Sequence, residues 1–282
     1  MNPLDFFKNL IKILRAKPHI PESLSENEPL QMILHRRSIR RFSDQDIPHD
    51  VFGAILEAGR LAPSTVNLQT WHFIAFTNSS WKQHFGQQIP FKGNRAVIVL
   101  GDINRTKQII TTFPYSPLVE YTTAVINASL AAMNMNIAAE ALKVSSVMLS
   151  ETGKSGYFDA QYLKEKLSLP NGVFPLMTMV FGYSQGGFAP MPPKLPLEAI
   201  LSNAPCYGEA DMEILRDWYN QMTAGYKAAF PLSSFKAQLE HYRRNIERAE
   251  KELRHLIFYK DRHSTLDEFP STNSTDRKEG SP

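Results

Sequence analysis

The sequence has little cysteine, no long apolar run and no excess of charge of either sign. A single cysteine, Cys206, excludes an intrachain disulfide framework and a cysteine-rich zinc site, and it fits a reducing cytoplasm. No stretch reaches the ~18 consecutive apolar residues that a membrane span needs. Lys and Arg number 31 against 28 Asp and Glu, so the formal net charge of +3 gives no reason to expect a wholly basic nucleic-acid-binding protein.

Motifs for nucleotide or metal chemistry are also missing or incomplete. No G-x-G-x-x-G occurs, so the dinucleotide fingerprint of a Rossmann fold is absent. The stretch SETGKSG, residues 150–156, is similar to the end of a P-loop, but Met148 stands where that motif requires its first glycine. His72 has no companion at metal-ligand spacing. We therefore expect neither an ATP site of this kind nor a metal site.

The first residues predict a short amphipathic helix. Leu4, Phe7, Ile11 and Leu14 recur at helical spacing, with lysines on the other side. We expect this helix to dock on its own chain or on a partner subunit, and a membrane-surface helix is the alternative. A polar, proline-containing stretch follows, so we assign residues 1–27 to an N-terminal helix and linker.

Helical and strand-like segments alternate over residues 28–205, which we assign to one main domain. The helix at 118–144 is largely apolar on every side and rich in alanine, so we expect it to be the buried central helix. Strands that alternate with helices predict an α/β or α+β sandwich. The other predicted helices are 29–37, 47–64 and 158–169, and the predicted strands are 71–78, 96–103, 145–150 and 174–183.

The composition changes beyond residue 205. Seven apolar residues recur at alternating intervals of four and three, which is a heptad seam. The seam must be buried somewhere, either against the same domain or around a second subunit. We assign residues 206–260 to a helical extension and residues 261–282, which are too polar to pack, to a disordered tail. The seam residues are Phe235, Leu239, Tyr242, Ile246, Ala249, Leu253 and Leu256.

Two polar stretches are candidates for a ligand site, and the first is HRRSIRRF, residues 35–42. Arg36, Arg37 and Arg40 can surround an anion with planar, charge-assisted hydrogen bonds, while Ser38 adds a hydroxyl. The alternative is a solvated or capping feature at a helix end, because the C-terminal turn of a helix favours cations.

The second candidate is APSTVNLQTWHF, residues 62–73, a break that follows a predicted helix and precedes a predicted strand. It presents Ser64, Thr65, Asn67 and Gln69, whose amides and hydroxyls can bind the edge of a heterocycle. Simple turn chemistry is the alternative when this stretch is considered alone.

Taken together, the two stretches resemble the nitroreductase family of FMN-dependent oxidoreductases. In that family a basic-serine signature, a helix and a PS-x-x-N-x-Q-x-W stretch follow one another in this order. The resemblance covers about residues 30–200, including the central helix and the strand that ends at Gly182 and Tyr183. It implies an α+β fold, a three-layer sandwich in which helices flank a central mixed β-sheet. It also implies a homodimer, here with an added long C-terminal helix.

The resemblance implies roles for residues at the phosphate end of FMN. Arg36, Arg37 and Ser38 match the family's opening triplet, which binds the phosphate and neighbouring ribityl or pyrimidine atoms. Arg40 matches a basic position that approaches the flavin ring. Lys194, in a proline-rich return, matches a basic residue that reaches the phosphate, although the family often has an arginine there.

Other matches concern the flavin ring. Ser64 and Asn67 match residues that contact the flavin, often from the other subunit, and Gln69 lies close by. Gly153 is the best match for the backbone that approaches the flavin, and Glu151 is expected near its reactive face. The loop SETGKSGYFD that carries both is longer and more polar than in relatives.

The implied activity needs no catalytic side chain and no metal, because the flavin N5 accepts hydride from NADH or NADPH and the reduced ring passes electrons to a second substrate. Nitroaromatics and quinones are the small-molecule acceptors that the resemblance suggests, with ping-pong kinetics and a cytoplasmic location. A flavin-binding sensor or carrier that acts through its C-terminal helix is the alternative. Nucleic-acid binding is not expected, since the sequence has neither a basic stripe nor an aromatic platform.

Overall fold

The computed structural model describes residues 1–112, 114–150, 159–186, 190–202 and 208–259. Glu151, Gly153 and Cys206 lie outside the described residues, and so does the polar tail that we expect to be disordered.

A four-stranded sheet forms the centre of the fold, with the strand order β1-β2-β4-β3. Every pairing between these strands is antiparallel. The expected α+β arrangement is confirmed, but the expectation of a mixed sheet is wrong for the described strands, where the parallel pairing is limited to an isolated bridge between Ser38 and Ser146. The strands are β1 (Trp71–Thr77), β2 (Arg95–Asp102), β3 (Ser145–Ser150) and β4 (Val173–Gly182).

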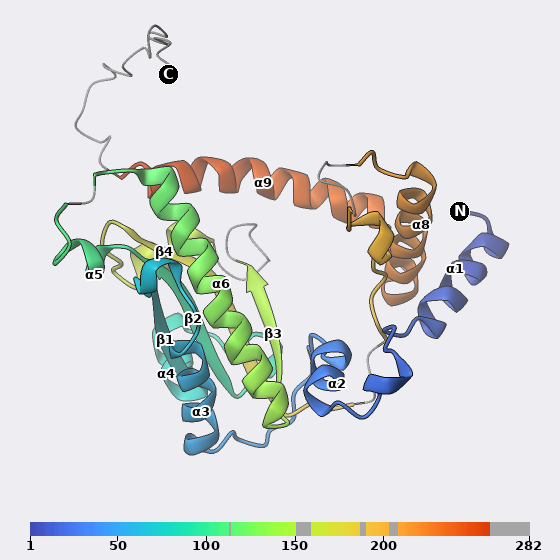
Figure 1. Ribbon diagram of the computed structural model, residues 1–282, viewed down its shortest axis with the longest axis horizontal. Helices are drawn as coiled ribbons and strands as arrows, with labels where there is room; N and C mark the ends of the chain where they lie inside the picture. Colours follow the sequence, from blue (N-terminus) through green and yellow to red (C-terminus); the bar gives the residue numbers. More distant parts are fainter. Residues whose placement is uncertain (113, 151–158, 187–189, 203–207, 260–282) are drawn as a thin grey trace, which may run out of the picture.

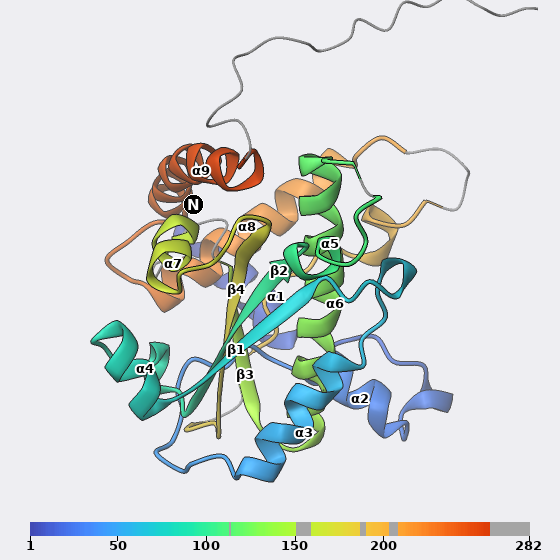
Figure 2. The same cartoon turned by 90° about the vertical axis from the view of Figure 1, so that its left-hand side faces the viewer.

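Helices cover both faces of the sheet because side chains of the central strands alternate between two hydrophobic cores. Val97 and Val99 of β2 belong to the core beneath α3 and α6, whereas Ile98 and Leu100 belong to the core beneath α4 and α7. Figure 2 shows these three layers. The helices are α3 (His49–Arg60), α4 (Asn78–Phe85), α6 (Pro117–Ala141) and α7 (Ala160–Lys166).

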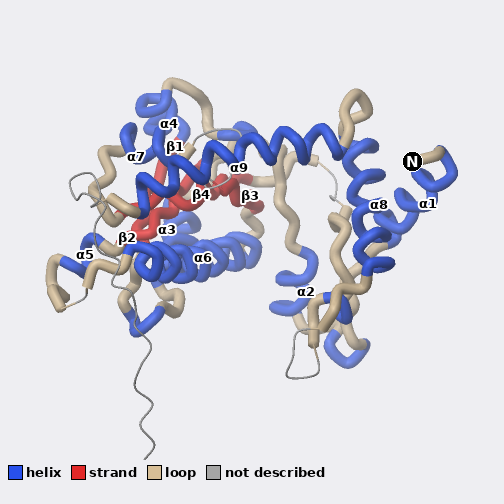
Figure 3. The backbone as a smooth tube through the Cα atoms, turned by 90° about the horizontal axis from the view of Figure 1, so that it is seen from above, coloured by secondary structure: helices blue, strands red, loops and turns tan. Residues whose placement is uncertain are grey.

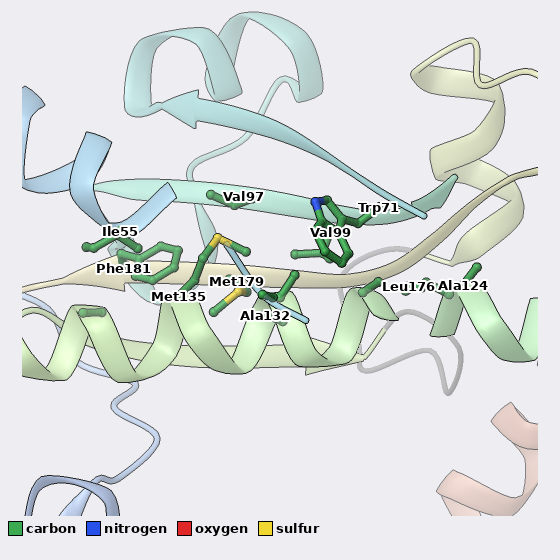
Figure 4. Close-up of a cluster of buried hydrophobic side chains, with 14 of the residues drawn as sticks. Ile55, Trp71, Val97, Val99, Ala124, Ala132, Met135, Leu176, Met179 and Phe181 are labelled. Atoms are coloured by element: carbon green, nitrogen blue, oxygen red, sulfur yellow. The ribbon is translucent and has the colours of Figure 1, made fainter. Parts of the chain in front are cut away.

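The expected central helix is α6, and its small residues allow close packing. Ala132 is buried beneath the sheet beside Met135, and Ala124 is buried further along the same helix (Figure 4). A Cβ at Gly59 of α3 would lie 2.6 Å from Met135 Cγ, so α3 can approach α6 closely only with glycine there. Only one face of α6 is buried in this way. Val119, on the opposite side, is exposed.

Three helices form an arm that extends from the sandwich (Figures 1 and 3). We call these helices the helical arm. They are α1 (Pro3–Arg15), α8 (Met212–Ala229) and the first half of α9 (Phe235–Ile257). Lys12 Nζ of α1 donates to Asp217 Oδ1 of α8 at 2.5 Å, and Ile13 lies against Gly225, where a Cβ would be 3.2 Å from its Cδ1. The N-terminal helix therefore docks on its own chain.

The two halves of the heptad seam of α9 differ in burial. Ala249 and Leu256 are buried against the sandwich. Leu239, Tyr242 and Ile246 are 41%, 48% and 46% exposed, respectively. The first alternative, packing on the same domain, thus describes only the second half of the seam. The sequence pattern also did not separate α8 from α9 within the helical extension.

The remaining helices are short. Asn27 caps α2 (Glu28–His35) by accepting from the Leu30 amide at 2.9 Å, and α5 (Asn104–Lys107) follows β2. The 3-10 turns are Glu22–Leu24, Thr65–Asn67, Pro90–Lys92 and Leu197–Ala199. Over the described ranges, no helix combines the length and the apolar character that crossing a membrane requires.

Candidate functional site

The basic segment, residues 36–41, leaves α2 in an extended conformation and runs beside the start of β3. The Ile39 amide donates to the Ser146 carbonyl at 3.1 Å, and Ser38 forms a parallel bridge with Ser146. The sheet therefore fixes the backbone of the basic segment, while the side chains of Ser38 and Arg40 remain exposed.

The arginines of this segment differ in their surroundings. Arg37 Nη1 donates to the carbonyls of Leu34 at 3.0 Å and Arg36 at 2.8 Å, so it caps the end of α2, as the capping alternative predicts. Glu140, near the end of α6, interacts electrostatically with Arg36 and Arg37. Burial raises the pKa of the Glu140 carboxyl, and the two positive charges act in the opposite direction.

The second candidate stretch forms a loop at residues 64–69, which we call the polar loop, and a buried amide holds it on α6. Asn127 Oδ1 accepts from the Thr65 amide at 3.0 Å and from the Thr65 hydroxyl at 3.1 Å. Its Nδ2 donates to Thr70 Oγ1 at 2.8 Å. Asn127 is fully buried, and its role was not predicted from the sequence. The available signal was a polar residue on the side of the helix that buries mainly alanines.

The polar loop has an unusual backbone. Val66, Asn67 and Gln69 have φ values of 50°, 55° and 49°, which lie in the left-handed region that non-glycine residues seldom adopt. The Gln69 amide donates to Ser64 Oγ at 3.1 Å, and Gln69 Nε2 donates to Asn67 Oδ1 at 3.4 Å. Strained backbone of this kind clusters at functional sites, and here it presents the exposed side chains of Asn67 and Gln69 together.

One chain does not bring the two groups together. The polar loop is held by Asn127 and the basic segment lies near Glu140, 13 residues further along α6. At 1.5 Å per helical residue this separation is about 20 Å along the helix axis. Lys194 is exposed in a third place, next to Pro193, whose carbonyl accepts from Trp218 Nε1 of α8 at 3.4 Å.

Two cavities adjoin the polar loop. One has a volume of about 740 Å³ and includes Gln69, His72 and Arg105 in its lining. The other, of about 310 Å³, lies between the polar loop and the start of α6 and includes Thr65 and Val119. Both volumes are large enough for a small organic molecule. Among the described residues, no group of His, Cys, Asp or Glu side chains is arranged to hold a metal ion.

Comparison with known sequences gives a consistent result. The family model described as "Nitroreductase family" matches residues 33–183, more than half of the chain. A protein of Archaeoglobus fulgidus, whose name proposes an NADH dehydrogenase or NAD(P)H nitroreductase, is 32% identical over 162 residues, which are 55% of this chain and 85% of that protein. An NAD(P)H FMN reductase of Bacillus subtilis is 30% identical over 189 residues, which are 62% of this chain and 72% of the reductase.

Solved structures share the fold. NfrA2 of B. megaterium has a TM-score of 0.68 at 20% identity, and the match covers 82% of this chain and 96% of that one. The NADPH:FMN oxidoreductase from Vibrio harveyi, solved in complex with NAD+, has a TM-score of 0.61 at 20% identity over 76% of this chain and 90% of that one.

Proposed function

The chain belongs to the nitroreductase family, and from this premise we propose that it is an FMN-dependent oxidoreductase that uses NADH or NADPH. The observation that carries the proposal is the basic segment, which β3 fixes so that Ser38 and Arg40 face outward beside Arg36. Relatives that are named as FMN reductases and NAD(P)H nitroreductases support the choice of cofactor.

The side chains present fit FMN by their chemistry. Guanidinium groups and a hydroxyl are donors that suit a phosphate dianion, and the two positive charges of Arg36 and Arg37 exceed the one negative charge of the half-buried Glu140 carboxylate. The amides of Asn67 and Gln69 offer both donors and acceptors, as the polar edge of a flavin ring requires. We propose that Lys194 adds a point charge at the phosphate, and that Ser64 helps to shape the ring-binding loop.

FMN, when bound, supplies hydride transfer from NAD(P)H and electron transfer to an acceptor. The chain's own tasks are to bind and to orient. The basic segment holds the phosphate, and the polar loop orients the ring edge and influences its redox potential through nearby donors. Asn127 keeps that loop in its left-handed conformation.

A second copy of the chain completes the site in this proposal. The basic segment and the polar loop are about 20 Å apart along α6, so we propose that one FMN binds the basic segment of one copy and the polar loop of the other. Apolar side chains are available for such a contact, since a monomer leaves them in water. They are Val119, Ile126 and Leu130 on α6 and Leu239, Tyr242 and Ile246 on α9.

Nitroaromatics and quinones are the acceptors we propose, reduced by ping-pong kinetics because both substrates use one face of the ring. The cavity of about 310 Å³ beside the polar loop is lined mainly by apolar atoms, which suits a flat aromatic acceptor. We place this activity in the cytoplasm, where a lone cysteine is compatible with the reducing environment.

An absorption spectrum of the purified protein tests the proposal. We expect a yellow protein that absorbs near ~450 nm, whose colour bleaches when NADH or NADPH is added without air and returns with a quinone. Protein that stays colourless and takes up no added FMN would refute flavin binding. Bound flavin that neither nucleotide bleaches would instead favour a sensor or carrier without turnover.

A further inference from the structure

Helix α1 is apolar on two sides, and only one side is covered. Asn9 and Ile13 are buried on the side that faces α8. On the other side, Leu4 is 79% exposed, Phe7 60%, Ile11 47% and Leu14 65%. We call these four residues the outer stripe. An exposed apolar patch of this kind marks a surface that meets another apolar phase.

Basic side chains border the outer stripe. Lys8 lies four residues after Leu4, and Arg15 lies four residues after Ile11, so each is the neighbour of a stripe residue on the helix surface. Lys17 is the second residue after the end of the helix. The single acidic residue of α1, Asp5, lies in the first turn, where it interacts favourably with the helix dipole.

The position of α1 in the fold keeps the outer stripe away from the sandwich. Figures 1 and 3 show α8 between α1 and the sheet. A copy of the chain that covers the exposed face of α6 would therefore meet α8 before it reached the outer stripe. Pairing two outer stripes would also bring Lys8 and Arg15 of each copy near like charges, which is unfavourable.

We propose that the outer stripe binds the surface of an anionic lipid bilayer, with α1 lying in the plane of the membrane. The apolar side chains enter the boundary between head groups and acyl chains, while Lys8, Arg15 and Lys17 contact lipid phosphates. The salt bridge from Lys12 to Asp217 holds α1 on α8, so the whole protein follows the helix to the membrane. This inference goes beyond the proposed function and does not depend on FMN binding.

Co-sedimentation of the full chain with lipid vesicles tests the inference. We expect the protein to sediment with vesicles of phosphatidylcholine and about one third phosphatidylglycerol, and much less with phosphatidylcholine alone. In the variant Phe7→Ser/Ile11→Ser, the ratio of bound to free protein should fall about tenfold or more. Leu232→Ser is the matched control, because Leu232 is a fully exposed apolar residue outside α1, and its binding should not change.

Two further measurements make the test decisive. Arg15→Gln/Lys17→Gln removes charge without touching the apolar residues, and it should weaken binding to the anionic vesicles about tenfold or more. If circular dichroism shows that Phe7→Ser/Ile11→Ser has lost helix, the result for Arg15→Gln/Lys17→Gln decides whether α1 binds the vesicles. Wild-type protein that stays in solution with anionic vesicles overturns the proposal. So does a fall in the mass measured by light scattering for either variant, because the outer stripe would then be a contact between copies.

Discussion

Replacing Asn127 by leucine removes the buried amide that holds the polar loop on α6. The change keeps a similar side-chain volume and deletes three hydrogen bonds, two to Thr65 and one to Thr70. Thr65 is exposed and can bind water instead, so its two bonds contribute little. Thr70 is buried and loses its partner.

These contributions give a magnitude. An unsatisfied buried polar group costs about 1–3 kcal/mol, and each exposed bond adds about 0.5 kcal/mol, so Asn127→Leu should lower the free energy of unfolding by about 2–4 kcal/mol. The three left-handed residues of the polar loop cost about 1 kcal/mol each at the least. The hydrogen bonds of Asn127 contribute a free energy comparable to this strain energy. The polar loop should therefore relax in the variant, and FMN affinity should fall about tenfold or more.

Urea denaturation followed by circular dichroism gives the free energy of unfolding, and quenching of FMN fluorescence on titration gives the affinity. Asn134→Ala is the matched control on the same helix, because the Asn134 amide makes one bond, to the Ala58 carbonyl of α3 at 3.1 Å. It should cost about 1 kcal/mol and leave FMN affinity unchanged. If Asn127→Leu loses stability but binds FMN as tightly as wild type, the conformation of the polar loop does not contribute to binding.

Arg36→Ala should weaken FMN binding by about 1.5–3 kcal/mol, which is the scale of a hydrogen bond to a charged group. The control Arg41→Ala, in the same segment, should bind FMN as tightly as wild type. Equal FMN titration curves for the two variants would show that Arg36 is not part of the site. Ile126→Arg places a charge on the exposed face of α6, so it should convert the proposed dimer into monomers in light scattering. A mass equal to that of the wild type would exclude this face as the contact. The hydrogen bond from Lys12 lowers the pKa of Asp217 below 3.8, so its stabilisation is present above that pH and is lost as the pH falls through the folded-state pKa. The melting temperatures of wild type and Lys12→Met should therefore converge in acid, and a constant difference would contradict the role of the pair.

Local patterns in the sequence predicted much of the fold. The alternation of helix and strand patterns predicted the four described strands and the flanking helices α3, α6 and α7, because both periodicities depend on near neighbours in the chain. The direction of pairing between strands was not predictable in this way, since it depends on how distant segments meet, and the sheet is antiparallel where a mixed one was expected. The difference in burial along the α9 seam was not predictable for the same reason. Leu239 and Leu256 occupy equivalent positions in the sequence pattern, but only Leu256 meets a distant part of the chain that buries it.

The candidate site was predictable only in part. The order of the basic segment and the polar loop identified the residue types that suit a phosphate and a heterocycle. It did not decide between anion binding and helix capping for Arg37, and it did not reveal that Asn127, some 60 residues from the polar loop, holds its backbone. The separation of the two groups along α6 is likewise a property of the folded chain. Roles for Glu151 and Gly153 remain predictions from the sequence resemblance.

The central claim is an FMN site that two copies share, and flavin content of a mixed dimer tests it most directly. One copy carries Arg36→Ala and the other Asn67→Ala, and different affinity tags allow the mixed dimer to be isolated. If each site combines two copies, one site has both substitutions and the other has neither, so the mixed dimer should bind one FMN that NADPH bleaches, while each variant dimer alone binds FMN weakly. A mixed dimer with no tightly bound FMN would show that each site lies within one chain and would contradict the account.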